Sequence, residues 1–223
     1  MIPIISVVGK SNVGKTTFLE KLVPELVRRG HRVAVIKHDF HGFDLDQPGK
    51  DTWRLSQAGS SVVAISSPQK VAVMRQVSRE MTVDEVALLI GPEVDIIFTE
   101  GYKRGDKPKI EVSRQAISSE LLCEPDELIA VVSDQSHSMS VPQFGLDDAG
   151  GVADLLERRY LRWGRFEDVL LLVDGKRIPM KGFVRDIIER AVRGMVSTLE
   201  GVGEANEVAL VLRRPPPPSE GER

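Results

Sequence analysis

The chain has 223 residues, of which 41% are hydrophobic and 28% are charged, so it can bury a core and stay soluble. That balance excludes a chain that is disordered throughout, and no apolar stretch reaches the roughly 18–20 residues of a membrane span. The formal net charge of -3 argues against a nucleic-acid binder, which usually carries a basic excess. The single cysteine, Cys123, cannot form an internal disulfide, and the N-terminus lacks the basic region of a signal peptide. We therefore expect a cytoplasmic protein with no membrane or nucleic-acid partner.

The first 37 residues predict a strand, a loop, a helix and a second strand. The continuous β-branched run Ile2–Val8 is typical of a strand buried on both faces. The loop Gly9–Gly14 follows, and over Lys15–Arg29 the apolar residues recur at helical spacing. Arg32–Lys37 predicts the next strand. Together they form a βαβ unit.

Strands and helices continue to alternate along the chain. The predicted helices are Asp51–Ala58, Thr82–Ile90 and Asp147–Tyr160. The predicted strands are Ser61–Ser66, Val71–Arg75, Val94–Thr99, Lys109–Val112 and Leu128–Ser133. Thr82 and Glu85 form a capping-box pattern at a helix start. The alternation predicts an α/β fold with a mostly parallel sheet flanked by helices.

The composition shifts to arginine and aromatic residues over 158–165, which suggests a domain boundary near residue 160. Beyond it we expect a small β-hairpin–helix–strand module over 166–212. It comprises a strand Phe166–Val173, a turn at Asp174-Gly175, a return strand Arg177–Met180, a helix Phe183–Leu199 and a strand Glu207–Leu212. A module of this size is small for independent stability, so it should pack on domain 1–160 or on a partner. The proline-rich residues 213–223 predict a disordered tail.

A phosphate-binding motif lies between the first strand and the first helix. Gly9-Lys10-Ser11-Asn12-Val13-Gly14-Lys15-Thr16 fits the pattern G-x-x-x-x-G-K-[ST], and Thr17 follows it. The glycines allow backbone N–H groups to converge on phosphate oxygens, and the helix dipole favours an anion at the same point. Lys15 should reach the β- and γ-phosphates, while Thr16 should give its hydroxyl to Mg²⁺. The motif occurs in the strand–loop–helix context that it requires.

A magnesium nucleotide site also needs a carboxylate at the carboxyl end of a neighbouring strand. Glu100 directly follows the strand Val94–Thr99 and is the candidate metal acid. Asp39 follows the second strand and could orient water or serve as a second metal ligand. An alternative is a transition-metal cluster, formed by His38, His41, Asp44 and Asp46. Its spacing is weak for zinc, and no cysteine lies nearby.

Four segments in this order and spacing resemble a known family. They are GKSNVGKTT, IKHDFHGFDLDQPGKDTWRLSQAG, DIIFTEGYK and AVVSD. Together they resemble the molybdopterin-guanine dinucleotide biosynthesis protein B family over roughly residues 2–158. The second segment, residues 37–59, is far more specific than the phosphate loop. The C-terminal module is not part of the family pattern, and docking to a partner or cofactor is one use for it.

The resemblance implies a GTP-binding protein with a P-loop, Rossmann-like fold that is usually dimeric and hydrolyses GTP weakly. It implies a partner, the molybdenum cofactor guanylyltransferase, which attaches GMP to molybdopterin, and leaves open whether molybdopterin binds directly. No N-K-x-D guanine motif is visible. Asp134, at the end of the strand Leu128–Ser133, is the candidate for guanine recognition. Lys50 and Asp51 would add charged groups near the phosphates or near molybdopterin.

Two other functions are compatible with the motifs. In a small-molecule kinase, Asp39 would orient the acceptor hydroxyl, but no arginine-rich lid is evident. In a non-catalytic carrier, the same loop would deliver nucleotide or pterin without hydrolysis. For a GTPase, Lys15, Mg²⁺ and the loop amides would neutralise the γ-phosphate, and slow turnover is expected because neither a general base nor an arginine finger is obvious.

Overall fold

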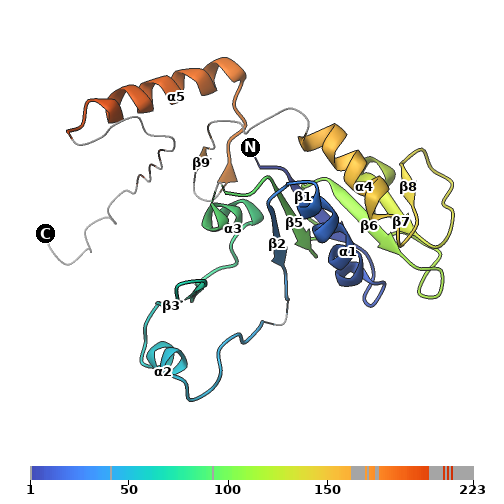
Figure 1. Ribbon diagram of the computed structural model, residues 1–223, viewed down its shortest axis with the longest axis horizontal. Helices are drawn as coiled ribbons and strands as arrows, with labels where there is room; N and C mark the ends of the chain where they lie inside the picture. The colour runs from blue at the N-terminus through green and yellow to red at the C-terminus, as the bar shows by residue number, and fades with distance from the viewer. Residues whose placement is uncertain are drawn as a thin grey trace, which may run out of the picture.

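The computed structural model describes residues 2–40, 42–91, 93–161, 169, 171–173, 176–200, 208, 210 and 212. Its centre is a sheet of six parallel strands in the order β2-β5-β1-β6-β7-β8 (Figure 1). The strands are β1 Ile4–Val8, β2 Val33–Lys37, β5 Ile96–Glu100, β6 Lys109–Ser113, β7 Leu128–Ser133 and β8 Gln143–Phe144. The predicted α/β class and parallel sheet are confirmed. Strand β8 was not predicted, because two residues are too few for a periodic pattern.

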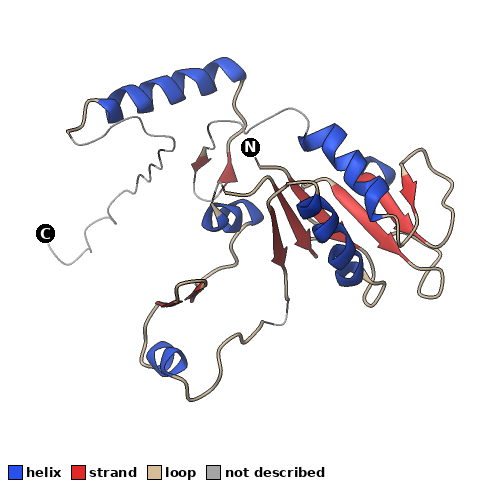
Figure 2. Ribbon diagram, in the orientation of Figure 1, coloured by secondary structure: helices blue, strands red, loops and turns tan. Residues whose placement is uncertain are grey.

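Helices cover both faces of the sheet (Figure 2). On one face α1, Lys15–Arg28, packs beside α4, Ala149–Leu156, which continues into a π-helical turn over Glu157–Leu161. On the other face α3, Val83–Ile90, packs against β2, β1 and β5. The capping box at Thr82 and Glu85 that the sequence predicts is present at the start of α3. The result is a three-layer α/β arrangement.

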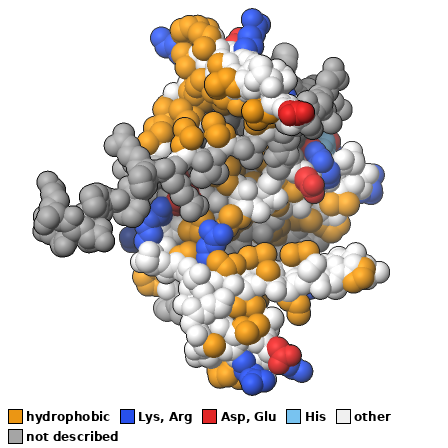
Figure 3. Space-filling view, turned by 90° about the vertical axis from the view of Figure 1, so that its left-hand side faces the viewer, with side chains coloured by type: hydrophobic (Ala, Val, Ile, Leu, Met, Phe, Trp, Pro, Cys, Tyr) orange, Lys and Arg blue, Asp and Glu red, His pale blue; other side chains and the backbone are white. Residues whose placement is uncertain are grey.

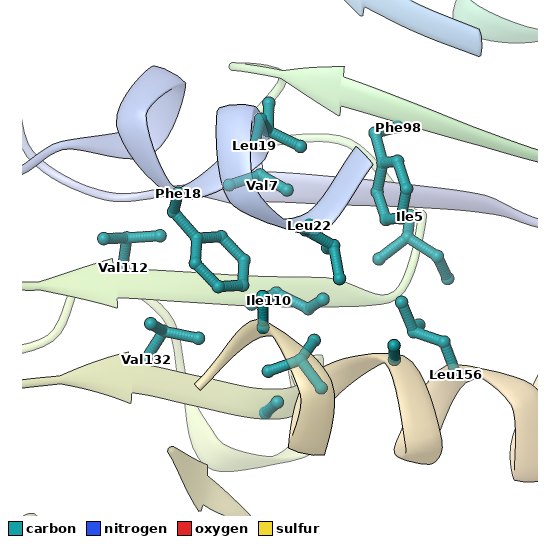
Figure 4. Packing of buried hydrophobic residues seen from close by; sticks show 14 of the residues in the cluster. Ile5, Val7, Phe18, Leu19, Leu22, Phe98, Ile110, Val112, Val132 and Leu156 are labelled. Carbon is teal, nitrogen blue, oxygen red and sulfur yellow. The ribbon is translucent and has the colours of Figure 1, made fainter. Parts of the chain in front are cut away.

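The largest core cluster lies between the sheet and the α1–α4 layer (Figure 4). Phe18 and Leu22 of α1 point onto β1 and β6, where they meet Val7 and Ile110. Leu156 of α4 closes the cluster. Fully burying one such side chain stabilises the fold by about 1.5–3 kcal/mol, so this layer holds α1 firmly behind the phosphate loop.

Strand β6 carries charged residues, yet its side chains are buried. Lys109 forms an ion pair with Glu127. The Glu111 carboxylate accepts hydrogen bonds from the backbone N–H groups of Leu122 and Cys123, at 2.6 and 3.0 Å. Burial, with the nearby Glu111 charge, raises the pKa of the Cys123 thiol to about 12, so Cys123 stays neutral. Both charged strand residues thereby fix the loop that joins β6 to β7.

Residues 38–82, here called the arm, leave the sheet after β2 and return at α3. The arm contains α2, Asp51–Gln57, and an antiparallel hairpin of β3, Val62–Ser66, and β4, Val71–Arg75. Figure 1 shows α2 and the hairpin standing away from the sheet. No residue of α2 is buried, and one residue of the hairpin strands, Val63, is. The two predicted strands are thus confirmed, but they form a separate sheet.

Near the C-terminus the described residues form a short hairpin and a helix. Strands β9, Leu172–Val173, and β10, Lys176–Arg177, pair antiparallel, and α5 spans Gly182–Ser197. The predicted hairpin and helix are therefore present, but the return strand does not extend over residues 178–180. Residues 166–168 and 170 of the predicted first strand and the turn at 174–175 lie outside the described residues. The predicted strand Glu207–Leu212 lies outside the described residues except for 208, 210 and 212, and the tail 213–223 lies outside them entirely.

Candidate functional site

The phosphate loop connects β1 to α1 at the carboxyl edge of the sheet. A side chain at Gly9 would place its Cβ 2.3 Å from the carbonyl oxygen of Val112, so only glycine fits. Asn12 and Gly14 adopt positive φ angles of 63° and 96°. Gly14 is the N-cap of α1 and uses no side chain for capping, so the first N–H groups of the helix face the loop. This backbone is suited to an anion.

Lys15 lies across the loop that it follows. Its Nζ donates hydrogen bonds to the carbonyl oxygens of Gly9 and Lys10, at 3.1 and 2.9 Å. Burial lowers its pKa; Glu100 opposes that shift, while Lys103 and Lys37 reinforce it. Three lysines and one glutamate therefore gather at this end of the sheet. A phosphate group would relieve the repulsion among the lysines.

Thr16 and Glu100 meet as the sequence predicts for a metal pair. The Thr16 hydroxyl lies 2.9 Å from each oxygen of the Glu100 carboxylate. Glu100 ends β5, the strand directly beside β1, so both groups lie at the same edge. Mg²⁺ prefers hard oxygen ligands and usually keeps several waters beside one or two carboxylates. A hydroxyl and a carboxylate at the phosphate loop fit that requirement.

Next to Glu100 the arm is joined to the sheet. His38, the first residue of the arm, donates its backbone N–H to the carbonyl oxygen of Glu100 at 3.0 Å. Its Nε2 lies 2.8 Å from the Glu80 carboxylate, and its ring lies 4.5 Å from that of Tyr102. Gly101, with φ of 107°, brings its α-carbon against the His38 side chain. The start and the end of the arm thus meet one residue from Glu100, a contact that the sequence did not predict.

On the opposite flank, the loop after β6 contacts the phosphate loop. The Lys10 ammonium donates to the Ser118 hydroxyl at 2.5 Å. Arg114 donates from Nε to the carbonyl oxygen of Val13 at 3.2 Å. Sequence reasoning missed Arg114, although its position directly after a strand at this edge could have indicated it.

The remaining candidate residues lie outside the phosphate loop and the Thr16–Glu100 pair. Asp134 is exposed at the end of β7, and its Oδ1 accepts the backbone N–H of Gln115 at 2.7 Å. Asp39 is exposed after β2. Lys50 and Asp51 begin α2, which the structure does not bring to the phosphate loop (Figure 1). The alternative was a transition-metal cluster around His38 and His41. Among the described residues no three metal-binding side chains lie close enough to hold an ion, and His41 lies outside the described residues.

The fold and the loop define a class, the α/β proteins with a P-loop. Comparison with protein-family models matches residues 4–134 to MobB, described as molybdopterin guanine dinucleotide synthesis protein B. The chain belongs to this family, as its sequence resemblance indicated.

Relatives and solved structures agree with that membership. A molybdopterin-guanine dinucleotide biosynthesis adapter protein from Haemophilus influenzae is 34% identical, over 70% of this chain and 88% of its own. A Methanocaldococcus jannaschii relative, described as such an adapter protein, is 25% identical, over 94% of this chain and 97% of its own. The crystal structure of Bacillus subtilis MobB has a TM-score of 0.58 at 26% identity, covering 71% of this chain and 98% of that one. The archaeal match therefore extends into the C-terminal part.

Proposed function

We propose that the protein is a GTP-binding adapter in molybdenum cofactor biosynthesis, acting with the guanylyltransferase that forms molybdopterin guanine dinucleotide. Its family and the adapter proteins that it resembles support the pathway. The observation that carries nucleotide binding is the phosphate loop with Lys15 across it and the Thr16–Glu100 pair beside it. A cytoplasmic location stays a prediction, and direct binding of molybdopterin stays an open question. No helix among the described residues is long and apolar enough to cross a bilayer.

The proposed chemistry is slow hydrolysis of GTP. Lys15 and the loop amides would bind the phosphates, and Thr16 and Glu100 would hold Mg²⁺, which neutralises charge on them when bound. Asp39, exposed at the same edge, is the proposed group for orienting water. An adapter with this arrangement would turn over slowly alone, because no arginine finger that would stabilise charge in the transition state is evident in the sequence.

Substitution of Lys15 tests nucleotide binding. In Lys15→Ala the ammonium that faces the phosphates is lost, and GTP binding measured by calorimetry should fall at least about a hundredfold. Lys15 is half-exposed, so the circular dichroism spectrum and the melting temperature should stay close to wild type. Wild-type GTP affinity in a folded Lys15→Ala protein would contradict the assignment.

Substitution of Glu100 tests the metal role separately. Glu100→Gln keeps the shape and the hydrogen bond from Thr16 but removes the charge. We expect the Mg²⁺ concentration needed for tight GTP binding to rise about tenfold, while binding without Mg²⁺ stays the same or improves. Asp95→Asn is the matched control, because Asp95 pairs with Arg32 before the start of the same strand. An unchanged Mg²⁺ titration in Glu100→Gln would place the metal acid elsewhere.

We further propose a homodimer formed through the arm. Phe40, Phe43 and Leu45 are 86%, 73% and 80% exposed, and the hairpin adds Ile65, Val71 and Val73. An isolated two-stranded hairpin is marginally stable in water, so such a surface needs a cover. A second copy would supply an equivalent arm.

Hydrolysis of GTP measured with and without the guanylyltransferase would separate an activated GTPase from a carrier that never hydrolyses.

A further inference from the structure

The nucleotide base needs a place beside the phosphate loop, and this inference rests on the proposed GTP binding. One flank of the loop holds Thr16 and Glu100 at the end of β5. The other flank is formed by the carboxyl ends of β6, β7 and β8. With the metal pair on the first flank, the second is where the base and sugar can extend.

Arg114 forms the side of this second flank nearest the loop. Its Nε and Nη2 each lie 3.6 Å, and its Cζ 3.9 Å, from the point where a Cβ would stand on Gly14. Both nitrogens are nearer to that point than the central carbon is, so the guanidinium turns its Nε–Nη2 edge toward Gly14, and the hydrogen bond from Nε to Val13 fixes its direction. A planar cation held at the last turn of a phosphate loop can stack on a purine ring.

Guanine differs from adenine and xanthine in presenting two donors side by side, N1–H and the C2 amino group, which a carboxylate accepts. Three carboxylates follow the strands of this flank. Asp134 already accepts the Gln115 N–H, and Asp148 caps α4 by accepting the Gly151 N–H at 2.8 Å. Asp147 instead has an ion pair with Lys21 of α1 at 2.5 Å, and its side chain is 90% exposed.

The Asp147 carboxylate is the one best able to take a ligand. Its contact is to a flexible surface lysine rather than to the backbone, and such exposed pairs are weak. Lys21 also approaches the Leu146 carbonyl oxygen at 3.5 Å, so the loop before α4 is held along α1, the helix that the phosphate loop opens. Lys21 is the main cause of the lowered pKa of Asp147, and Arg114 contributes too.

We propose that the guanine ring lies between Arg114 and the loop of residues 145–148, with Arg114 against its face and Asp147 accepting its N1–H and C2 amino donors. This replaces Asp134 as the group that selects guanine. Arg114 would serve any purine, whereas Asp147 would provide the discrimination between bases.

The test compares the affinities of the full-length protein for GTP and XTP with Mg²⁺ by calorimetry. Xanthine carries a carbonyl where guanine carries the C2 amino group, so an asparagine amide at 147 complements it. In Asp147→Asn, GTP should weaken by about tenfold to a hundredfold and XTP should tighten, lowering the GTP/XTP preference. Lys21→Gln removes the same ion pair but keeps the carboxylate, and Asp134→Asn alters the competing group. Both should retain the wild-type preference.

The outcomes separate the two proposals. A wild-type protein that binds no guanine nucleotide overturns the proposed function itself. Three other outcomes overturn this inference alone. They are tight GTP binding with an unchanged GTP/XTP preference in Asp147→Asn, a shifted preference in Asp134→Asn instead, and a wild-type protein that binds GTP and XTP equally. All three positions are at the surface, and a melting curve for each variant would confirm folding.

A second measurement tests Arg114. Arg114→Ala should weaken GTP, GDP and ATP by a similar factor, about twofold to thirtyfold, because stacking does not distinguish the bases. Arg114→Lys keeps the charge but loses the plane, so it should not restore binding. Full rescue by lysine, or an effect confined to the triphosphates, would show that Arg114 acts on phosphate charge and would overturn its place against the base.

Discussion

The sheet edge and the arm are neighbours in sequence and differ in how they are stabilised. Around the phosphate loop, α1 is packed on the sheet by Phe18 and Leu22, which are buried, and the loop itself is closed by hydrogen bonds. In the arm, by contrast, large apolar side chains are exposed on α2 and on both hairpin strands. Figure 3 shows hydrophobic side chains at the surface in the lower part, where the arm lies, and in the upper part, where α5 lies. The difference teaches that the phosphate loop is held by packing and hydrogen bonds within one chain, whereas the arm leaves apolar side chains exposed, as the proposed contact with a second copy requires.

The strongest test of this contrast is a core substitution. Leu22→Ala leaves a cavity between α1 and the sheet, where Leu22 is fully buried. The free energy of unfolding, measured by urea denaturation, should fall by about 2–5 kcal/mol. A loss below about 1 kcal/mol would mean that this layer does not hold the site.

The boundary between the two regions gives an effect that depends on pH. Arg79, in the arm, and the capping interaction with Thr82 lower the pKa of Glu85 to about 2, below its ordinary value of 4.5. A lowered folded-state pKa stabilises the protein above pH 4.5, and the benefit is lost as the pH falls toward 2. Glu85→Gln should therefore be less stable than wild type at pH 7 and approach it at low pH. Parallel melting curves in acid and at neutral pH would check this, and a constant difference would contradict it.

Substitution within the arm should barely affect the monomer. Val73 is 59% exposed, so Val73→Ser should change the free energy of unfolding of dilute protein by no more than about 0.5 kcal/mol. If a second copy covers the hairpin, the same change should shift the monomer–dimer equilibrium measured by analytical ultracentrifugation. Ser60→Ala, outside the hairpin strands, is the control. A monomeric wild type would break this side of the comparison.

Removal of the C-terminal part should have the smallest effect on nucleotide binding. Leu156 is fully buried and Tyr160 and Leu161 pack against the main core, so a chain ending after Leu161 retains that layer. It should bind GTP as tightly as the full chain, because the phosphate loop, Glu100 and Asp147 all precede the cut. Weaker binding in a folded truncation would assign part of the site to residues beyond 161.

Sequence reasoning succeeded where local pattern determines structure. Lys15 and Thr16 were placed by the β-branched run of β1, the loop glycines and the helical spacing of α1. Glu100 was placed at the same edge by the buried strand that it ends. It failed where long-range contacts decide. Burial of Glu111 depends on N–H groups 11 and 12 residues away, and the hairpin was predicted without any indication that it leaves the sheet. The ion pair between Asp147 and Lys21 likewise depends on the packing of the loop after β8 beside α1, which no local pattern indicates.

The contact between His38 and Glu80 joins the two ends of the arm beside the sheet. Its two ends are fastened together, and the same histidine is bonded to the backbone of Glu100 and packed on Gly101 and Tyr102. The arm is therefore attached to the sheet at Glu100, the proposed metal ligand. If Glu100 holds Mg²⁺ as proposed, a protein that binds the far end of the arm would act on the metal through the hydrogen bond between His38 and Glu100, without touching the nucleotide. A change at the metal would reach the arm by the same route.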